Sequence, residues 1–294
     1  MSNQKKSYLF ALSAILLWST VSTAFKIALK ELDYIQLLFI SSFVATIILA
    51  IIIIFQKKGQ LIFSSTKKEL ANSAFVGFLN PFAYYLILFK AYSLLPAQIA
   101  QPLNYTWPIV LVLLSAPLLK QKLYKKSIIA LFVSFIGVFV ISTQGNLTEF
   151  KIDNPFGVAL AAGSSIIWAL FWILNVKDKR DEIIKLFYNF LFGTIYTLII
   201  ILLFSDIRFE FSKSFISAIY IGFFEMGFTF VLWLKALQYA TSNEKISNLV
   251  YLSPFMALIF INLILKEEIF YTTLIGLIFI IAGIFIQQIK LKKH

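Results

Sequence analysis

Residues 96–119 read PAQIAQPLNYTWPIVLVLLSAPLL, an apolar run long enough to cross about 30 Å of hydrocarbon, which takes about 20 residues. Polar residues nevertheless recur along it, since Gln101, Tyr105 and Pro108 follow Gln98 at i+3, i+7 and i+10. At about 100° per residue, these four positions fall within an arc of roughly 80° on one helix face. A lipid-facing helix would not carry them there. The stretch therefore predicts a membrane span that is polar on one side and weakened by proline near its middle.

The same pattern returns in residues 241–265 at an offset of 146. The matched pairs are Gln98 with Glu244, Tyr105 with Tyr251 and Pro108 with Pro254. The same offset persists into the next apolar runs, where Gly137 matches Gly283. Two further matches, of residues 11–19 with 161–169 and of residues 89–96 with 234–241, pair Trp18 with Trp168 and Lys90 with Lys235. These pairs predict two sequence repeats, at residues 7–145 and 155–290.

The composition places the chain in a membrane. Hydrophobic residues make up 60% of the 294 residues, charged residues make up 14%, and the mean hydropathy is +0.87, far above that of soluble domains. The net charge of +12 does not indicate nucleic-acid binding, because Lys and Arg occupy short gaps between apolar runs. There is no cysteine, one histidine (His294) and no GxxxxGK[ST] motif, so we predict no catalytic triad, metal site, ATP hydrolysis or cofactor.

Ten apolar runs predict an all-α membrane protein of ten transmembrane helices. We place them at residues 8–29, 34–55, 71–94, 97–119, 127–143, 156–176, 184–204, 214–237, 243–265 and 271–289. The runs are continuous rather than alternating, which argues against strands. The first run has no A-x-A-like site at its end and is predicted to be an uncleaved span. Five spans in each repeat require the second repeat to enter the membrane from the opposite side, as in inverted-repeat transporters.

Basic residues predict the orientation. With ten spans and the N-terminus inside, 18 of the Lys and Arg residues lie in cytoplasmic segments and five lie outside. The five outside are Lys30, Lys151, Arg208, Lys213 and Lys266. Because short cytoplasmic loops are rich in Lys and Arg, both termini are predicted to be cytoplasmic.

Several motifs resemble one transporter superfamily. They are W-S-T from Trp18, L-K-A-L-Q-Y-A-T-S from Leu234, S-P at Ser253, L-K-E-E from Leu265, and G-L-I-F-I-I-A-G from Gly276. Together they resemble the drug/metabolite transporter superfamily, and within it the EamA-type members with two five-helix repeats. The N-Y-T-W-P run from Asn104 is further similar to N-Y-x-W-P in bacterial aromatic amino acid exporters. The usual Gly-Glu of the family after the ninth span is here Lys266 and Glu267, and Gln121 stands where the first half would carry that Glu.

The resemblance implies a secondary-active exporter of amino acids or related small metabolites, working by alternating access through a central cavity lined by both repeats. It implies a bacterial inner-membrane protein, monomeric or homodimeric. A carrier of drugs, amines or nucleotide sugars is the alternative within the superfamily. A polytopic enzyme should cluster Asp, Glu or His at one membrane face, and a scaffold needs no paired intramembrane polar residues. A phosphate-bearing cargo requires converging basic residues, whereas Lys90 and Lys235 are predicted toward opposite faces.

Polar and aromatic residues within the spans are the candidate substrate-binding residues. They are Asn80, Gln98, Gln101, Asn104, Tyr105, Trp107, Glu225, Asn248 and Tyr251, with Pro108 and Pro254 as candidate gating positions. The amides could instead bond one another between helices. The aromatic residues could simply pack, and proline could only shape a kink. Trp18 and Trp168 suit packing and substrate stacking equally.

Glu225 is the only one of the 14 acids that falls near the centre of a predicted span, and Asn80 is its match at an offset of 145. An ionised carboxylate there costs about 2.5–3.5 kcal/mol, so Glu225 must face a cavity or a partner, or bind a proton. We expect it to carry a coupling proton or to contact a substrate amine. The alternatives are a protonated Glu225 bonded to a neighbouring helix and an ion pair with Lys26.

Overall fold

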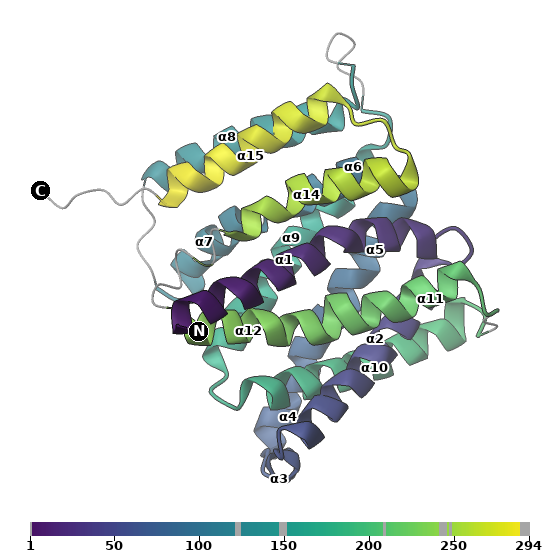
Figure 1. The fold of residues 1–294 in the computed structure, drawn as a ribbon, viewed down its shortest axis with the longest axis vertical. Coiled ribbons are helices and arrows are strands. Elements are labelled where there is room, and N and C mark those ends of the chain that lie inside the picture. The colour runs from purple at the N-terminus through teal and green to yellow at the C-terminus, as the bar shows by residue number, and fades with distance from the viewer. Residues whose placement is uncertain are drawn as a thin grey trace, which may run out of the picture. The chain divides into compact units, whose positions relative to one another are not determined.

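The structure, a computed structural model (Figure 1), describes residues 2–120, 125–146, 152–207, 210–240, 246 and 249–288. In these ranges every regular element is a helix. In chain order they are α1 (Asn3–Ala28), α2 (Tyr34–Phe55), α3 (Gly59–Ile62), α4 (Lys67–Gly77), η1 (Phe78–Ala83), α5 (Tyr84–Leu94), α6 (Ala97–Asn104), α7 (Trp107–Leu118), α8 (Lys125–Ser142), α9 (Pro155–Lys177), α10 (Glu182–Phe204), α11 (Lys213–Tyr220), η2 (Ile221–Phe228), α12 (Thr229–Tyr239), η3 (Leu249–Leu252), α14 (Ser253–Phe260), η4 (Ile261–Leu265) and α15 (Tyr271–Gln288).

Eight of the described helices are long and apolar enough to cross a membrane, counting consecutive elements such as α4–η1–α5 as one helix. Two shorter apolar helices, Leu249–Leu265 and Tyr271–Ile286, follow them. The all-α membrane fold is therefore confirmed, and the predicted spans fall on these helices. The count of ten crossings stays a prediction.

Side-chain caps explain where several of these helices begin. The Asp33 carboxylate accepts from the backbone N–H groups of Ile35 and Gln36 at the start of α2. Thr66 and Glu69 form a reciprocal capping box at the start of α4. Such caps bond backbone donors that have no partner within the helix. They fix where these helices start, which the apolar runs alone leave undefined.

The chain divides into two compact units, and each contains segments of both predicted repeats. Unit 1 comprises Met1–Phe89 and Asp178–Lys266, and unit 2 comprises Lys90–Lys177 and Glu267–His294. These units are defined by contacts and the repeats by sequence, so the repeat boundaries at 7–145 and 155–290 stay a prediction.

In unit 1, α1 lies along the helix formed by α11, η2 and α12, and it also contacts α14 (Figure 1). The other side of that helix packs on α2, which in turn packs on α10. Buried hydroxyls join these helices: Ser7 donates to the carbonyl of Ala236 (2.7 Å), and Ser41 donates to the carbonyl of Ala218 (3.0 Å). Small polar residues thus allow the backbones to approach closely.

In unit 2, α8 and α15 form a tightly packed pair. A Cβ atom on Gly137 would lie 2.5 Å from the carbonyl oxygen of Gly276, and a Cβ on Gly276 would lie 2.5 Å from that of Gly137. Glycine at both positions is therefore what lets the two backbones touch. The remaining helix of this unit, α9, packs on α6 and α7.

Three lysines follow apolar helices and lie in the left-handed backbone region: Lys57 after α2, Lys120 after α7 and Lys266 after η4, with φ of 54°, 55° and 58°. For a residue other than glycine, this backbone conformation is unfavourable by about 1 kcal/mol, whereas glycine adopts it freely. Lys266 stands where the resembling family usually has glycine.

We expect Lys266→Gly to raise the free energy of unfolding by about 0.5–1 kcal/mol, because glycine relieves the backbone strain. Thermal unfolding of the purified protein in detergent measures it. The matched control is Lys68→Gly within α4, where the same substitution should destabilise by about 1 kcal/mol. A Lys266→Gly protein that is no more stable than the wild type would contradict the prediction.

Candidate functional site

Both candidate gating prolines lie at the start of a helical segment within an interrupted span. The fourth span breaks after α6 at Asn104, and α7 resumes at Trp107 with Pro108 in its first turn. In the ninth span, the 3-10 helix η3 gives way to α14, which has Pro254 in its first turn. Proline is tolerated in a first turn because the N–H it lacks would have no intrahelical partner there. The gating role itself stays a prediction.

The side chain of Gln98, at the start of the polar face, makes three hydrogen bonds within unit 2. Its Nε2 donates to the carbonyl of Glu268 (2.7 Å), while its Oε1 accepts from the N–H of Phe270 (2.8 Å) and the hydroxyl of Thr273 (3.3 Å). The Glu267 carboxylate accepts from the N–H groups of Ala97 and Gln98, at 3.2 and 3.3 Å. Glu267 thus caps α6, and Gln98 ties that end to the segment before α15.

We expect Gln98→Ala to lower membrane abundance and transport in parallel, because it removes bonds that hold α6 in place.

Tyr105→Ala and Tyr251→Ala should each reduce transport more than they reduce the amount of folded protein, if these aromatic residues contact the cargo. Abundance by immunoblot and uptake per folded molecule separate the two cases. Parallel losses in both tyrosine variants would assign these residues to packing.

The other candidates are distributed over both units. In unit 2, Asn104 donates from Nδ2 to the hydroxyl of Ser164 on α9 (2.8 Å), Gln101 is buried, and Tyr105 and Trp107 are partly exposed. In unit 1, Tyr251 is buried in η3. Asn248 and Glu244 lie outside the described residues. Substrate contact by all of these residues stays a prediction.

Glu225 lies in unit 1, within the π-helical segment η2, and is 9% exposed. The hydroxyl of Tyr85 on α5 donates to its Oε1 atom across 3.0 Å. Its other carboxylate oxygen, Oε2, is buried and has no hydrogen-bond partner among the described residues. The carboxylate therefore accepts a hydrogen bond from a neighbouring helix through one oxygen and has its other oxygen unpaired. Whether Glu225 is protonated stays a prediction.

Tyr85 was not among the sequence candidates. It is buried against Phe89, with ring centroids 5.3 Å apart, and Phe89 packs on Phe25 at 4.9 Å. The sequence match of Tyr85 at an offset of 145 is Phe230, so the repeat gives no sign of a polar partner there. Only the tertiary packing brings the hydroxyl to Glu225.

The segments around Asn80 and Glu225 both depart from regular α-helix. The segment η2 is π-helical, whereas η1 joins two helices across a kink at Asn80, and residues 78–83 correspond to 223–228 at the offset of 145. Asn80 is completely buried, has non-helical φ and ψ of −150° and 122°, and lacks partners for both Oδ1 and Nδ2 among the described residues. Short π-helical segments occur frequently at functional sites.

Three further buried hydroxyls of unit 1 lack partners among the described residues: those of Thr23, Thr229 and Ser253. An unpaired buried polar group costs about 1–3 kcal/mol. With Asn80 and Glu225, these groups come from α1, η1, η2, α12 and α14. The interior of unit 1 therefore presents hydrogen-bonding groups of the kind that a polar ligand engages, and its acidic member is Glu225.

The two repeated tryptophans each pack among other aromatic residues. Trp18 lies 5.3 Å from Trp233, and Trp168 lies 5.7 Å from Phe171, measured between ring centroids. These ring contacts match the packing interpretation of the tryptophans. The ammonium of Lys235, which is also a repeated residue, lies 5.6 Å from the ring centroid of Phe10 in a cation–π contact.

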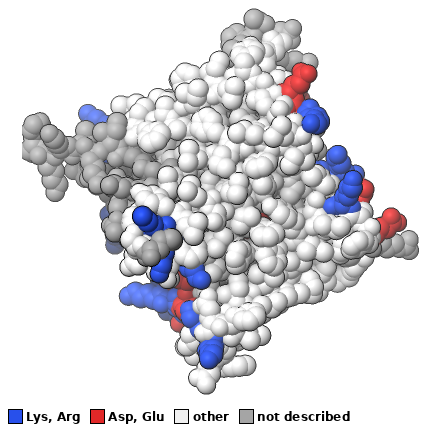
Figure 2. All heavy atoms as spheres, viewed as in Figure 1, with Lys and Arg blue, Asp and Glu red and all other residues white. Residues whose placement is uncertain are grey.

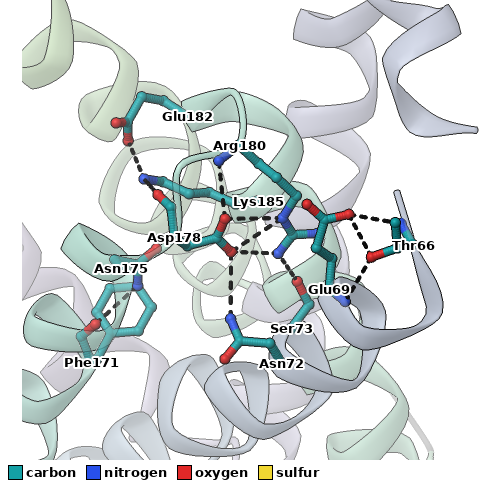
Figure 3. A network of polar contacts seen from close by, with 10 residues as sticks. All are labelled: Thr66, Glu69, Asn72, Ser73, Phe171, Asn175, Asp178, Arg180, Glu182 and Lys185. Carbon is teal, nitrogen blue, oxygen red and sulfur yellow. Dashed lines mark hydrogen bonds and ion pairs between the residues drawn. The ribbon is translucent and has the colours of Figure 1, made fainter. Parts of the chain in front are cut away.

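A second polar cluster of unit 1 surrounds the start of α10 (Figure 3). The Arg180 guanidinium bonds the Asp178 carboxylate at 2.6 Å and the Ser73 hydroxyl of α4 at 2.6 Å. Both charged side chains are nearly buried, with 9% and 10% exposed. The Asp181 carboxylate pairs with Lys58 at 2.7 Å and caps α10. The cluster ties α4 to the segment that leads into α10.

Opposing effects act on the two aspartates of this cluster. Burial raises the pKa of Asp178, but hydrogen bonds from Arg180 and its charge outweigh burial and hold that pKa below its ordinary range. Burial likewise raises the pKa of Asp181. Hydrogen bonds from the Lys58 ammonium and from the backbone N–H groups of Ile183 and Ile184 outweigh burial and bring that pKa below its ordinary range. Both carboxylates are therefore ionised at neutral pH.

Comparison with known proteins agrees with the fold. The sequence model of the EamA-like transporter family matches residues 5–143 and 155–287. An uncharacterized transporter of Archaeoglobus fulgidus is 28% identical over 98% of this chain and 99% of its own length. One of Clostridium kluyveri is 27% identical over 98% and 95%. The uncharacterized transporter YoaV of Bacillus subtilis is 23% identical over 98% and 99%.

A solved crystal structure superposes with a TM-score of 0.67 at 18% identity, covering 95% of this chain and 96% of the other. This likeness concerns the fold alone. The family match covers nearly the whole chain and falls on the apolar helices described above. The chain is a multi-pass membrane protein that belongs to the EamA-like transporter family.

Proposed function

We propose that this chain is a secondary-active exporter of amino acids or related amine-bearing metabolites, acting by alternating access in a bacterial inner membrane with both termini cytoplasmic. The main support for this proposal is the buried Glu225 carboxylate. One of its oxygens accepts a hydrogen bond from Tyr85, and the other has no partner among the described residues. A carboxylate within the membrane needs a balancing group. A cargo ammonium or a coupling proton provides one.

The chemistry of the unpaired groups favours an amine over a phosphate. A phosphorylated cargo is recognised by Arg and Lys donors. Among the described residues of unit 1, the unpaired buried groups within the helices are one carboxylate, one amide and three hydroxyls. The remaining unpaired atom, Nη1 of Arg180, lies in the loop before α10, where that guanidinium is paired with Asp178. The carboxylate attracts an ammonium, while the amide and hydroxyls can donate to a carboxylate. This combination suits a zwitterionic amino acid and disfavours a nucleotide sugar.

Counterflow in proteoliposomes tests the proposal. The purified protein is reconstituted, loaded with a mixture of unlabelled amino acids, and assayed for uptake of each labelled amino acid. For a transported amino acid, we expect competition by the amine that lacks its carboxylate and none by the acid that lacks its amine. Uptake blocked by nucleotide sugars or by the deaminated acid, and unaffected by the amine, would overturn the proposal.

A coupling proton is tested in the same vesicles. An imposed pH gradient should drive net movement of the cargo, and collapse of the gradient with a protonophore should stop it. If counterflow continues but net movement of the cargo does not respond to the pH gradient, the amine site is retained and proton coupling is rejected.

A further inference from the structure

The connector between α2 and α4, residues 55–68, exposes an unusual combination of side chains. Phe55 is 82% exposed, Leu61 is 41% exposed and Phe63 is 90% exposed. Lys57, Lys67 and Lys68 are also exposed. The segment contains no acidic residue. Its free surface is therefore both apolar and positively charged.

The connector is held in place by the rest of unit 1. Ile62 packs against the cluster formed by Ile53, Ile183, Ile184 and Val231. Its carbonyl accepts a hydrogen bond from the hydroxyl of Tyr188 across 2.7 Å. The Lys58 ammonium pairs with Asp181 at 2.7 Å. Because Ile62 is the residue turned toward the protein, Leu61 and Phe63 on either side of it are fixed facing outward.

Its position in the chain puts this surface at a membrane face. The connector joins two membrane-length helices, one ending at Phe55 and the other beginning at Lys67. Figure 2 shows Lys and Arg, with Asp and Glu among them, near the end of unit 1 at which Figure 1 places α3. Among the described residues, Lys57, Lys67 and Lys68 take part in no ion pair. Three ammonium groups and two large apolar side chains thus face the same boundary.

We propose that residues 55–68 form a binding surface for anionic lipid, on which Leu61 and Phe63 enter the boundary between headgroups and acyl chains. Lys57, Lys67 and Lys68 bind the headgroup phosphates. Segments that place apolar side chains into this boundary and lysines at its phosphates bind anionic membranes by both effects. A water-soluble partner would instead require the apolar side chains to lie clear of the lipid. The inference is independent of the cargo and of the direction of transport.

Depth-dependent quenching tests the apolar part. Phe63→Trp is made in the full chain and reconstituted with lipids brominated near the headgroup or near the chain end, and the wild-type signal from its five native tryptophans is subtracted. The exposed site tolerates the change. We expect strong quenching by the shallow bromines and weak quenching by the deep ones. Quenching by aqueous iodide with none by brominated lipid would overturn the proposal and indicate a surface for a soluble partner.

Lipid selectivity tests the charged part. Spin-labelled phosphatidylglycerol and phosphatidylcholine are compared for association with the wild type and with a Lys57→Gln, Lys67→Gln, Lys68→Gln triple variant. At low salt we expect the preference for phosphatidylglycerol to fall by roughly fivefold per lysine. The matched control removes Lys5, Lys30 and Lys213, which lie outside the connector, and should keep the preference. An unchanged preference in the connector variant would overturn the proposal.

Discussion

Glu225→Gln is expected to fold and reach the membrane in normal amounts but to lose transport by about tenfold or more. Glutamine keeps the shape of the side chain and an oxygen that can accept from Tyr85, so the helix contact survives. It removes the negative charge that would balance a cargo ammonium or a proton. We therefore also expect transport by the variant to lose its dependence on pH between about pH 5 and 8.

Two further variants make this result interpretable. Glu31→Gln removes an exposed acid elsewhere in the chain and should change neither abundance nor rate. Tyr85→Phe keeps the carboxylate and removes its donor, so it should reduce transport less than Glu225→Gln does. A Glu225→Gln protein with an unaltered rate and pH profile would rule out the role given to this carboxylate. Loss of abundance in step with transport would give Glu225 a structural role.

Arg180→Ala is expected to destabilise the protein by about 3 kcal/mol, because it leaves the Asp178 carboxylate without its buried partner. The Arg180–Asp178 pair is about nine-tenths buried on both sides, and the same guanidinium also holds Ser73 of α4. Thermal unfolding in lipid nanodiscs should show a midpoint lowered by several degrees. The matched control is Lys58→Ala, whose pair with Asp181 is 33% and 26% exposed and should be worth about 1 kcal/mol or less. Equal shifts in the two variants would contradict the prediction.

Acid should weaken the same cluster. The pKa values of Asp178 and Asp181 lie below the ordinary 3.8 in the folded protein, so the unfolded chain takes up protons first as the pH falls. Their contribution to stability is complete above about pH 5, declines below the unfolded value, and is lost as the pH passes through the folded pKa values. Unfolding midpoints measured from pH 7 to pH 3 should fall faster for the wild type than for an Asp178→Asn variant.

The sequence predicts helix boundaries well where apolar content alone determines the extent of the helix. The run at 34–55 coincides with α2, Tyr34–Phe55, because an uninterrupted apolar stretch has few other stable forms in lipid. Pro108 and Pro254 also mark real interruptions, since proline cannot donate within a helix. Helical periodicity likewise placed Gln98 on a polar face. Its partners lie about 170 residues away in the chain, so their identity needed the structure.

The candidate site likewise contains residues that the sequence reveals and residues that only the structure reveals. An acid at mid-span is visible in the sequence, and this position alone marks Glu225 as a candidate. The Tyr85 hydroxyl that binds it comes from 140 residues away, and no local pattern distinguishes that tyrosine from the other twelve of the 13 in the chain. Arg180 was hidden for a different reason. It lies among lysines that predict a solvated cytoplasmic loop, and only the packing of Ser73 and Asp178 around it reveals its burial.

The π-helical form of η2 has a consequence for how this helix tolerates changes in length. Deleting one residue from an ordinary α-helix turns everything beyond the deletion by about 100° and separates packed side chains from their partners. A π-helical turn already contains a surplus residue, because its hydrogen bonds run from i to i+5. A single deletion within Ile221–Phe228 can therefore be absorbed by a return to α-helical bonding, while α11 and α12 keep their contacts with α1. Length variants there would reposition the Glu225 side chain and leave the scaffold around it in register.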